Sequence, residues 1–282
     1  MILIADAGST KTDWCFCEKG AIVKSVRTQG INPCSQSRDD IIKILQSELA
    51  ASVDEISPMQ VSRLFYYGAG CATQAICKDV KEMLGGIFPA AEISVSSDML
   101  GAARALCGRN EGIACILGTG SNSCLYDGNS IVDQIPSLGY ILGDEGSSSA
   151  LGRRLLGDCL KRRLPEAVSK EFMERYSLTM EDIIENVYRK PMANRYMAGF
   201  APFLYEKRRI SQVHNMLIVC FSDFFQRNVM AYRRAWLPIN FVGSLADSFS
   251  AELSEAAESL GMTVGKILKS PMEGLVAYHR ED

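Results

Sequence analysis

Two glycine-containing polar loops follow apolar, strand-like runs in the sequence, and both could bind phosphate. The first covers residues 6–13 (DAGSTKTD) and follows the run 2–5, whereas the second covers residues 118–123 (GTGSNS) and follows the run 113–117. Glycine lets the backbone approach a phosphate, and amides and hydroxyls then donate hydrogen bonds to its oxygens. Asp6 ends a buried strand and is predicted to hold a hydrated Mg²⁺.

Other interpretations of these loops are weaker. An ordinary polar turn needs only about two to four residues and no lysine. The chain contains no GxxxxGK[ST] motif, which excludes a P-loop protein. Residues 118–123 run into a strand and residues 68–73 lack the third glycine, so neither is a good dinucleotide-binding motif.

A third feature is the carboxylate Asp98, which follows the expected strand 92–96 and begins a helix that extends to about residue 106. The helix dipole and the first N–H groups are expected to keep it ionised, as a proton acceptor requires. The alternative role is an ordinary N-cap. Since the only histidines are His214 and His279, a multi-histidine metal site is excluded.

A repeated unit indicates how these loops are positioned. Strand, polar loop, strand, turn and strand occur once in residues 2–23 and again, 112 residues later, in residues 113–132. Placing Gly8 over Gly120 also aligns Trp14 with Tyr126. The repeat predicts two homologous halves, each built around its own loop.

Mixed strands and helices predict an α/β protein. The expected strands are 2–5, 14–17, 21–23, 61–67, 92–96, 113–117, 124–126, 130–132 and 239–242. The expected helices are 39–51, 74–84, 98–106, 147–164, 179–190, 193–208, 211–235 and 246–260. Gly85 and Gly86 are expected to stop the second helix. Phe221, Phe224 and Phe225 in the helix 211–235 could pack inside one half or form the seam of a homodimer.

Composition narrows the function classes. The chain has 282 residues, 47% of them hydrophobic, and a formal net charge of −3, so we expect a globular core and no nucleic-acid partner. No apolar run approaches the ~20 residues of a membrane span, and we expect no membrane association. The ten cysteines form no CxxC pair. Without a secretory signal at the N-terminus, they predict reduced thiols in a cytoplasmic protein.

The motifs resemble a known family. Residues 6–13 and 117–122 resemble the two phosphate loops of the actin/hexokinase/Hsp70-like ATPases. Residues 139–147 (GYILGDEGS) resemble the signature of the N-acetylglucosamine kinase branch of the BadF/BadG/BcrA/BcrD ATPase family, and residues 68–70 and 270–274 are similar to it too.

This resemblance implies a two-lobed actin-like ATPase (ribonuclease H-like) fold with duplicated halves, mixed sheets and a central nucleotide cleft. It implies an N-terminal ATPase lobe, 1–108, and a C-terminal ATPase lobe, 109–267, with a C-terminal helix, 268–282, packing back on the first lobe. The implied activity is ATP-dependent phosphorylation of a hydroxyl of an amino sugar, N-acetylglucosamine or glucosamine, with MgATP held between the two phosphate hairpins.

The resemblance also implies residue roles. Asp98 matches the catalytic base and Asp6 the metal anchor, and Lys11 could neutralise phosphate charge or remain solvated. The matched sugar contacts are Asn32, Asp98, Ser121, Asn122, Gly139 and Asp144. The matched nucleotide contacts are Gly8, Ser9, Thr10, Lys11, Thr12, Gly118, Thr119, Gly120, Gly243 and Ser244.

One departure and two alternatives remain. The sugar kinases carry Gly-Trp-Gly where this chain has residues 137–139 (SLG), which leaves recognition of the acetamido group open. One alternative is an ATPase activator of a 2-hydroxyacyl-CoA dehydratase or benzoyl-CoA reductase system, whose Fe–S ligands would have to include Cys71 with Cys77 or Cys107. The other is a non-catalytic sensor that binds a sugar or nucleotide.

Overall fold

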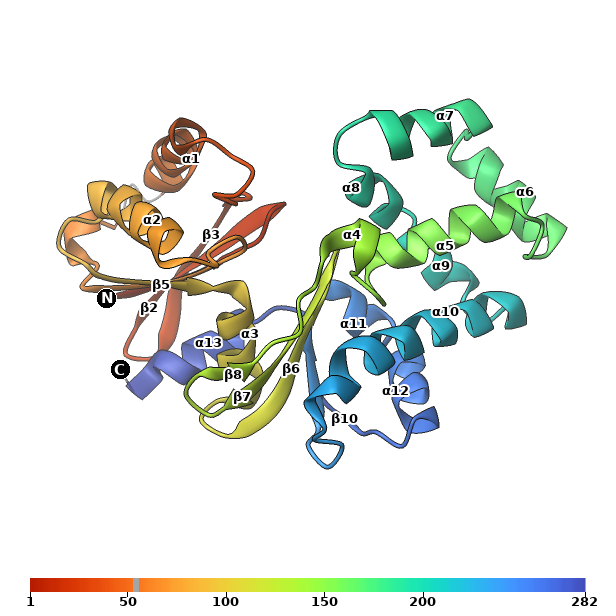
Figure 1. Ribbon diagram of the computed structural model, residues 1–282. Helices are drawn as coiled ribbons and strands as arrows, with labels where there is room; N and C mark the ends of the chain where they lie inside the picture. Colours follow the sequence, from red (N-terminus) through yellow and green to blue (C-terminus); the bar gives the residue numbers. More distant parts are fainter. Residues whose placement is uncertain (53–55, 282) are drawn as a thin grey trace. The chain divides into compact units, whose positions relative to one another are not determined.

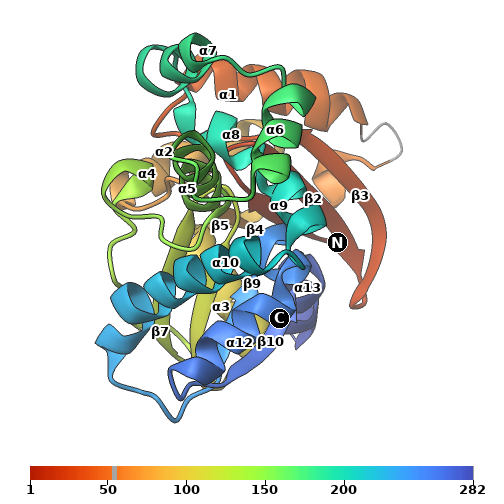
Figure 2. The ribbon, with the colours of Figure 1, turned by 90° about the vertical axis from the view of Figure 1, so that its right-hand side faces the viewer.

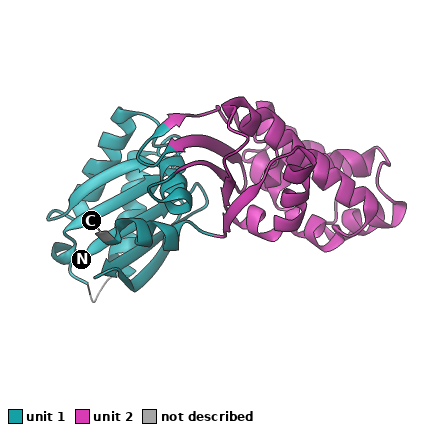
Figure 3. Ribbon diagram, turned by 90° about the horizontal axis from the view of Figure 1, so that it is seen from below, with its two compact units in different colours: residues 1–110, 127–131, 270–282 teal, residues 111–126, 132–269 magenta. Residues whose placement is uncertain are grey.

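The computed structural model describes residues 1–52 and 56–281 (Figure 1). The chain forms two compact units, coloured separately in Figure 3. Unit 1 comprises residues 1–110, 127–131 and 270–282, and unit 2 comprises residues 111–126 and 132–269. Relative to the predicted lobes, unit 1 also takes in the hairpin turn at 127–131.

The sheet of unit 1 is five-stranded, in the order β3-β2-β1-β4-β5. Its strands are β1 (Ile2–Ala7), β2 (Lys11–Glu18), β3 (Ala21–Gln29), β4 (Arg63–Gly68) and β5 (Glu92–Ser97). The strand β1 is antiparallel to β2 and parallel to β4, so the sheet is mixed as predicted. The carboxyl ends of β1, β4 and β5 therefore lie at the same end of the sheet.

Successive side chains of a strand point to opposite faces of the sheet, so the core of unit 1 has two layers. Its helices are α1 (Arg38–Ile44), α2 (Gln74–Ile87), α3 (Asp98–Cys107) and α13 (Met272–Tyr278). Leu3 and Ala5 pack with the apolar residues of α1 and α2. Ile4, from the same strand, packs with Ala105 of α3 and Leu275 of α13. One face is therefore covered by α1 and α2, and the other by α3 and α13.

Unit 2 repeats this topology. Its strands are β6 (Glu111–Leu117), β7 (Ser121–Asp127), β8 (Ile131–Asp133), β9 (Ile239–Val242) and β10 (Val264–Leu268). Their order, β10-β9-β6-β7-β8, is that of unit 1 when β6 to β10 correspond to β1 to β5. The parallel pairs β6–β9 and β9–β10 also correspond to β1–β4 and β4–β5. The duplicated α/β halves expected from the repeat are confirmed.

Helices form most of the rest of unit 2. They are α4 (Gly139–Leu142), α5 (Ser148–Leu160), α6 (Glu166–Arg175), α7 (Met180–Ile184), α8 (Ala193–Ala198), α9 (Ala201–Lys207), α10 (Ser211–Phe224), α11 (Ser244–Ser248) and α12 (Ser250–Ser259). The helix α10 lies beside α12 (Figures 1 and 2). Phe221, Phe224 and Phe225 are each 0% exposed in the core of unit 2, so they are not available for a seam between two copies.

Several predicted helix boundaries are wrong. The helix α2 continues through Gly85 and Gly86 to Ile87, because the apolar face that includes Leu84 remains packed on the sheet. The expected helix 193–208 is divided at Gly199 into α8 and α9. The expected helix 211–235 is regular only to Phe224 and ends in π-helical and 3-10 turns.

The elements α4, α6 and β10 were not predicted, and neither was a short 3-10 helix at Pro58–Gln60. The strand β10 begins before the expected C-terminal helix 268–282, which is helical only from Met272 to Tyr278 and then ends in a 3-10 turn. Gly265 and Lys266 interrupt the apolar pattern of β10, which explains why residue types alone do not indicate a strand there.

A buried polar network in unit 1 joins the C-terminal segment to α3. The Tyr67 hydroxyl lies 2.7 Å from Nε2 of His279, and Nη1 of Arg104 donates to the same hydroxyl at 2.8 Å. His279 is 2% exposed and stacks on Phe65, with 3.7 Å between ring centroids. The helix that begins with Asp98 is thus held by the last helix of the chain.

The adjacent tyrosine gives a direct comparison. Tyr67→Phe should lower the free energy of unfolding by about 1–3 kcal/mol, because it removes the hydroxyl that contacts both His279 and Arg104 in the buried network. Tyr66→Phe should lower it little or raise it, since the buried Tyr66 hydroxyl has no hydrogen-bond partner among the described residues. Urea denaturation of both variants measures the difference. Equal losses in the two variants would contradict the network's role.

Candidate functional site

In unit 1, Asp98 is the first residue of α3, directly after the carboxyl end of β5. The residue that caps the helix is Ser97, whose side chain accepts a hydrogen bond from the amide of Leu100 at 3.3 Å. Oδ1 of Asp98 accepts from the amide of Met99 at 2.8 Å. The N-cap alternative for Asp98 is therefore wrong, and its carboxylate is not needed to cap the helix.

The electrostatic setting of Asp98 differs from the expected one. Burial raises the pKa of Asp98, and the N–H of Met99 opposes this rise only in part. The helix N–H groups lower the pKa of this carboxyl, as expected, but burial has the larger effect on it. A raised pKa is the direction of shift that suits a general base, since such a base works best when its pKa is close to the ambient pH.

Asp6 is the last residue but one of β1 and lies opposite Asp13 of β2. Burial raises the pKa of Asp6 to about 7, and the negative charges of Asp13 and Asp98 add to the rise. Thr12 is 0% exposed, and because successive side chains of a strand alternate, its hydroxyl lies on the other face of the sheet from Asp6 and Asp13. A divalent cation would offset the repulsion and keep Asp6 ionised.

These residues fit a hydrated Mg²⁺. That ion is usually held by one or two protein carboxylates, with water and phosphate oxygens completing its shell. Among residues 1–52 and 56–281, no group of three or more His, Cys, Asp or Glu side chains could hold a metal by itself. Asp6 is thus suited to an anchor that shares its metal with phosphate.

The raised pKa of Asp6 predicts a pH-dependent cost to stability. The folded state binds a proton between the unfolded pKa of 3.8 and the folded value of about 7, so stability falls as the pH rises through this window. Asp6→Asn should therefore stabilise the metal-free protein near pH 8, by up to about 4 kcal/mol, and much less near pH 4.5. Urea denaturation at both pH values measures this, and an equal effect at both would contradict the raised pKa.

The first glycine loop forms the turn between β1 and β2. The amide of Gly8 donates to the carbonyl of Lys11 at 2.9 Å, which closes the turn. Nδ2 of Asn32 donates to Oγ of Ser9 at 2.8 Å, so the predicted sugar contact lies against the predicted phosphate loop. A Cβ on Gly30 would collide with the backbone of Ser9, and glycine is therefore required there.

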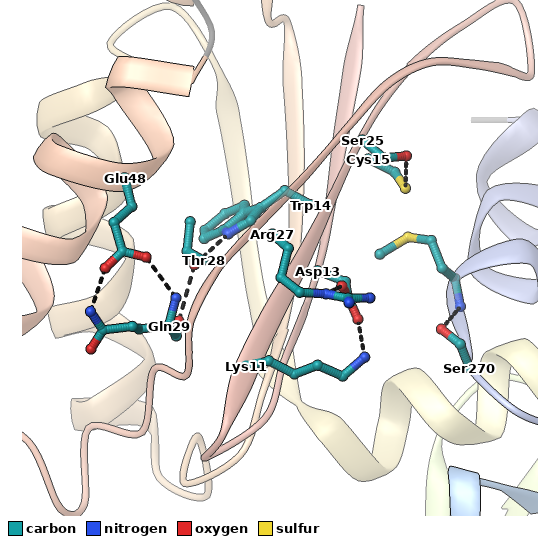
Figure 4. A network of polar contacts seen from close by, with 11 residues as sticks. Lys11, Asp13, Trp14, Cys15, Ser25, Arg27, Thr28, Gln29, Glu48 and Ser270 are labelled. Atoms are coloured by element: carbon teal, nitrogen blue, oxygen red, sulfur yellow. Dashed lines mark hydrogen bonds and ion pairs between the residues drawn. The ribbon is translucent and has the colours of Figure 1, made fainter.

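Lys11 has a partner that the sequence did not indicate. Its Nζ lies 2.6 Å from Oδ2 of Asp13, and Nε of Arg27 lies 2.6 Å from Oδ1 of the same carboxylate (Figure 4). Burial opposes ionisation of Asp13, but the hydrogen bonds from Lys11 and Arg27 lower its pKa overall. Lys11 is exposed, and its charge is already partly neutralised.

The second glycine loop lies in unit 2 between β6 and β7. The amides of Ser148 and Ser149, at the start of α5, donate to the carbonyls of Gly118 and Thr119 at 2.9 and 3.2 Å. The amide of Ser121 donates to Oδ1 of Asp144 at 3.1 Å. One segment that is distant in sequence, residues 144–149, therefore holds the loop in place.

Asp144 is held tightly beside this loop. It is 8% exposed and has φ of 55°, a left-handed conformation that Asp tolerates better than most residues. Burial raises its pKa, and the N–H of Ser121 opposes the rise. A Cβ on Gly120 would lie 2.9 Å from Oδ1 of Asp144, so glycine allows this approach.

The remaining predicted residues of unit 2 differ in placement. Gly243 follows β9 with φ of 134°, and a Cβ there would collide with the carbonyl of Leu117, at the end of β6. Gly243 and Ser244 therefore lie at the same end of the sheet as the second loop. Oδ1 of Asn122 accepts from Nε2 of Gln134 at 3.2 Å. Gly139 begins the short helix α4, and nothing lies within 4 Å of a Cβ built there.

The structure thus gathers Asp6, the first loop, Asn32 and Asp98 at one end of the sheet of unit 1. It gathers the second loop, Asp144, Gly243 and Ser244 at the corresponding end in unit 2. The role of Ser97 as the helix cap was not predicted, although a serine directly before a helix is a recognisable signal.

The cysteines that an Fe–S site would use lie in unit 1. Cys71 is 4% exposed, and burial raises the pKa of its thiol to about 12, whereas a metal ligand must be a thiolate. The thiol of Cys77 donates to the carbonyl of Cys71 at 3.6 Å. No helix among the described residues is long and apolar enough to cross a membrane.

No family model and no curated protein matches the chain, but solved structures do. The "Putative N-acetylglucosamine Kinase" from Porphyromonas gingivalis is 47% identical, with a TM-score of 0.97 over 100% of this chain and 99% of that one. The protein of the same description from Chromobacterium violaceum is 18% identical, with a TM-score of 0.75 over 98% of each chain. A ROK family glucokinase from Streptomyces griseus, in complex with glucose and AMPPNP, is 14% identical, with a TM-score of 0.57 over 98% and 97% of the two chains.

The duplicated sheets and the loops at their carboxyl ends place this protein among the actin-like ATPase folds, the class that includes these sugar kinases. The 47% identity over the whole chain identifies the family more closely. The chain belongs to the N-acetylglucosamine kinase family, which confirms the resemblance found in the sequence.

Proposed function

We propose that this protein is an ATP-dependent kinase that phosphorylates a hydroxyl of an amino sugar, with N-acetylglucosamine as the preferred acceptor and glucosamine as the next candidate. The observation that carries the proposal is the full-length likeness to the Porphyromonas gingivalis protein of that description. The placement of Asp98 and of the two glycine loops supports it.

In unit 1, Asp98 accepts the proton of the attacking sugar hydroxyl. Its raised pKa and its position at the end of β5 support this role. Asn32 contributes a sugar contact beside Ser9. The loop residues Gly8, Ser9, Thr10 and Thr12 bind the nucleotide phosphates, and Gly8 contributes by letting the backbone approach closely, since its own amide closes the turn. Asp6 would hold Mg²⁺, which when bound neutralises phosphate charge.

In unit 2, Gly118, Thr119 and Gly120 bind the nucleotide phosphates, and Gly243 with Ser244 binds the nucleoside end. Asp144, Ser121, Asn122 and the backbone of Gly139 bind the sugar. The fixed position of Asp144 against the amide of Ser121 supports this assignment. A pre-organised carboxylate loses little conformational entropy when it accepts hydrogen bonds from sugar hydroxyls. Lys11 is proposed only as a secondary source of positive charge, since it is paired with Asp13.

A coupled ADP-release assay tests the proposal. The acceptors to compare are N-acetylglucosamine, glucosamine, N-acetylmannosamine, glucose and no sugar, each with MgATP. The proposal predicts the highest kcat/KM with N-acetylglucosamine and little ADP release without sugar.

Other outcomes support the alternatives. Tight sugar binding without turnover would instead indicate a sensor. A visible absorption band in anaerobically purified protein, with ATPase activity independent of sugar, would indicate an Fe–S activator.

A further inference from the structure

Four strands form the edges of the two sheets: β3 and β5 in unit 1, and β8 and β10 in unit 2. An unprotected edge exposes backbone donors and acceptors to other chains, and proteins limit this with charges, bulges or short strands. The strand β3 carries Lys24 and Arg27 and has a register shift against β2. The strand β10 carries Lys266 and has a register shift against β9, and β8 has three residues.

The fourth edge, β5, has no bulge and no basic residue, and its one charged residue is Glu92, at its first position. Its six residues (EISVSS) pair with β4 without a register shift and include no lysine, arginine or proline. The amide of Glu92 donates inward, to the carbonyl of Ser62 at 2.9 Å. In a parallel pair the residues alternate, so the backbone groups of Ile93 and Val95 point towards the free side.

A cavity of about 650 Å³ follows this edge. Lys78 and Lys81 of α2 line it from one face of the sheet, and Arg63 and Phe65 of β4 line it from the other, with residues 92–95 between them. A strand laid along β5 places alternate side chains over these two faces, which is how sheets bind extended peptides. The shape of the groove therefore fits an extended chain.

The charges of the groove select the kind of chain. Lys78 and Lys81 are exposed, and among the described residues neither has an ion pair or hydrogen bond. Arg63 lies 4.0 Å from Glu92, so positive charge on its face is partly neutralised. In a chain bound along β5, acidic side chains are therefore favoured on the face next to Lys78 and Lys81 of α2, and apolar side chains on the face next to Phe65.

We propose that the free edge of β5 binds an extended acidic segment of a partner protein by strand addition. Two copies of this chain are a poorer match, because pairing their β5 edges brings Arg63, Lys78 and Lys81 of both copies together. This proposal does not depend on the kinase activity, and none of these residues is assigned to the kinase site.

The test uses a fluorescent eight-residue peptide of alternating Glu and Val with blocked ends, titrated into the full-length protein and followed by anisotropy. We expect saturable binding that weakens with salt. Lys78→Glu combined with Lys81→Glu should reduce affinity at least tenfold, because the groove then repels the peptide. Lys43→Glu combined with Lys161→Glu, the same charge change outside the groove, should not, and both double variants should retain kinase activity.

Backbone pairing is tested separately with two peptides, N-methylated at the odd or at the even positions. Strand addition predicts that only one of the two loses binding, and that hydrogen exchange slows at Ile93 and Val95. The proposal is overturned if no saturable binding occurs, or if both methylated peptides bind like the parent peptide. It is also overturned if inorganic phosphate displaces the peptide at equal concentration, or if the protein dimerises through this edge.

Discussion

Asp98→Asn is expected to lower kcat by about 10²–10⁴-fold, the usual contribution of a general base. The asparagine side-chain oxygen can still accept from the amide of Met99, and Ser97 still caps α3, so the fold should be unchanged. The variant should bind sugar and nucleotide nearly as wild type does. Steady-state kinetics, with calorimetry of each ligand, separates loss of chemistry from loss of binding.

The matched control is Asp182→Asn. Asp182 is also an acid in the first turn of a helix, where it forms a capping box with Thr179, and it has no assigned role in the kinase site. Its variant should retain wild-type kcat even if it loses some stability. An Asp98→Asn protein that keeps kcat within a few-fold of wild type would rule out Asp98 as the base.

Asp144→Asn should raise the KM for the sugar by about 10- to 100-fold and change nucleotide affinity little. The reason is that hydrogen bonds to a charged acceptor contribute about 1.5–3 kcal/mol each. The substitution is structurally mild: asparagine tolerates the left-handed backbone at φ of 55°, and its oxygen can accept from the amide of Ser121.

Asp144→Ala provides the contrast. It leaves the amide of Ser121 without its partner and puts a strained residue at this position, so it should lower the melting temperature as well as sugar affinity. Comparing KM and melting temperature for the two variants separates recognition from folding. If Asp144→Asn had wild-type KM for every sugar accepted by the enzyme, Asp144 would not be a sugar ligand.

Apolar runs and turn residues predicted many of the strands and helices, because these elements form where the residue types of the segment itself favour them. The repeat at 112 residues anticipated two homologous halves, since each strand of the repeated unit has its own apolar run and turn. The strand β10 escaped prediction because its stability comes from pairing with β9, and not from its own residue types. Likewise, α2 continues through two glycines that would end an isolated helix, because Leu84 is packed in the core.

In the candidate site, too, some features could be predicted from the sequence and others could not. Loops with glycine, hydroxyl and carboxylate groups were recognisable from residue type. The pairing of Asp13 with Arg27 was not, because it depends on the register of β2 against β3. The raised pKa of Asp98 also escaped prediction, since burial is set by the packing of residues distant in sequence.

The central claim is tested most directly by following the phosphoryl group itself. The protein is incubated with [γ-³²P]ATP, Mg²⁺ and N-acetylglucosamine, and the sugar is separated and counted. Wild-type protein should produce labelled sugar phosphate in a one-to-one ratio with ADP, and Asp98→Asn almost none. ADP release that leaves the sugar unlabelled, or equal labelling by the two proteins, would contradict the account.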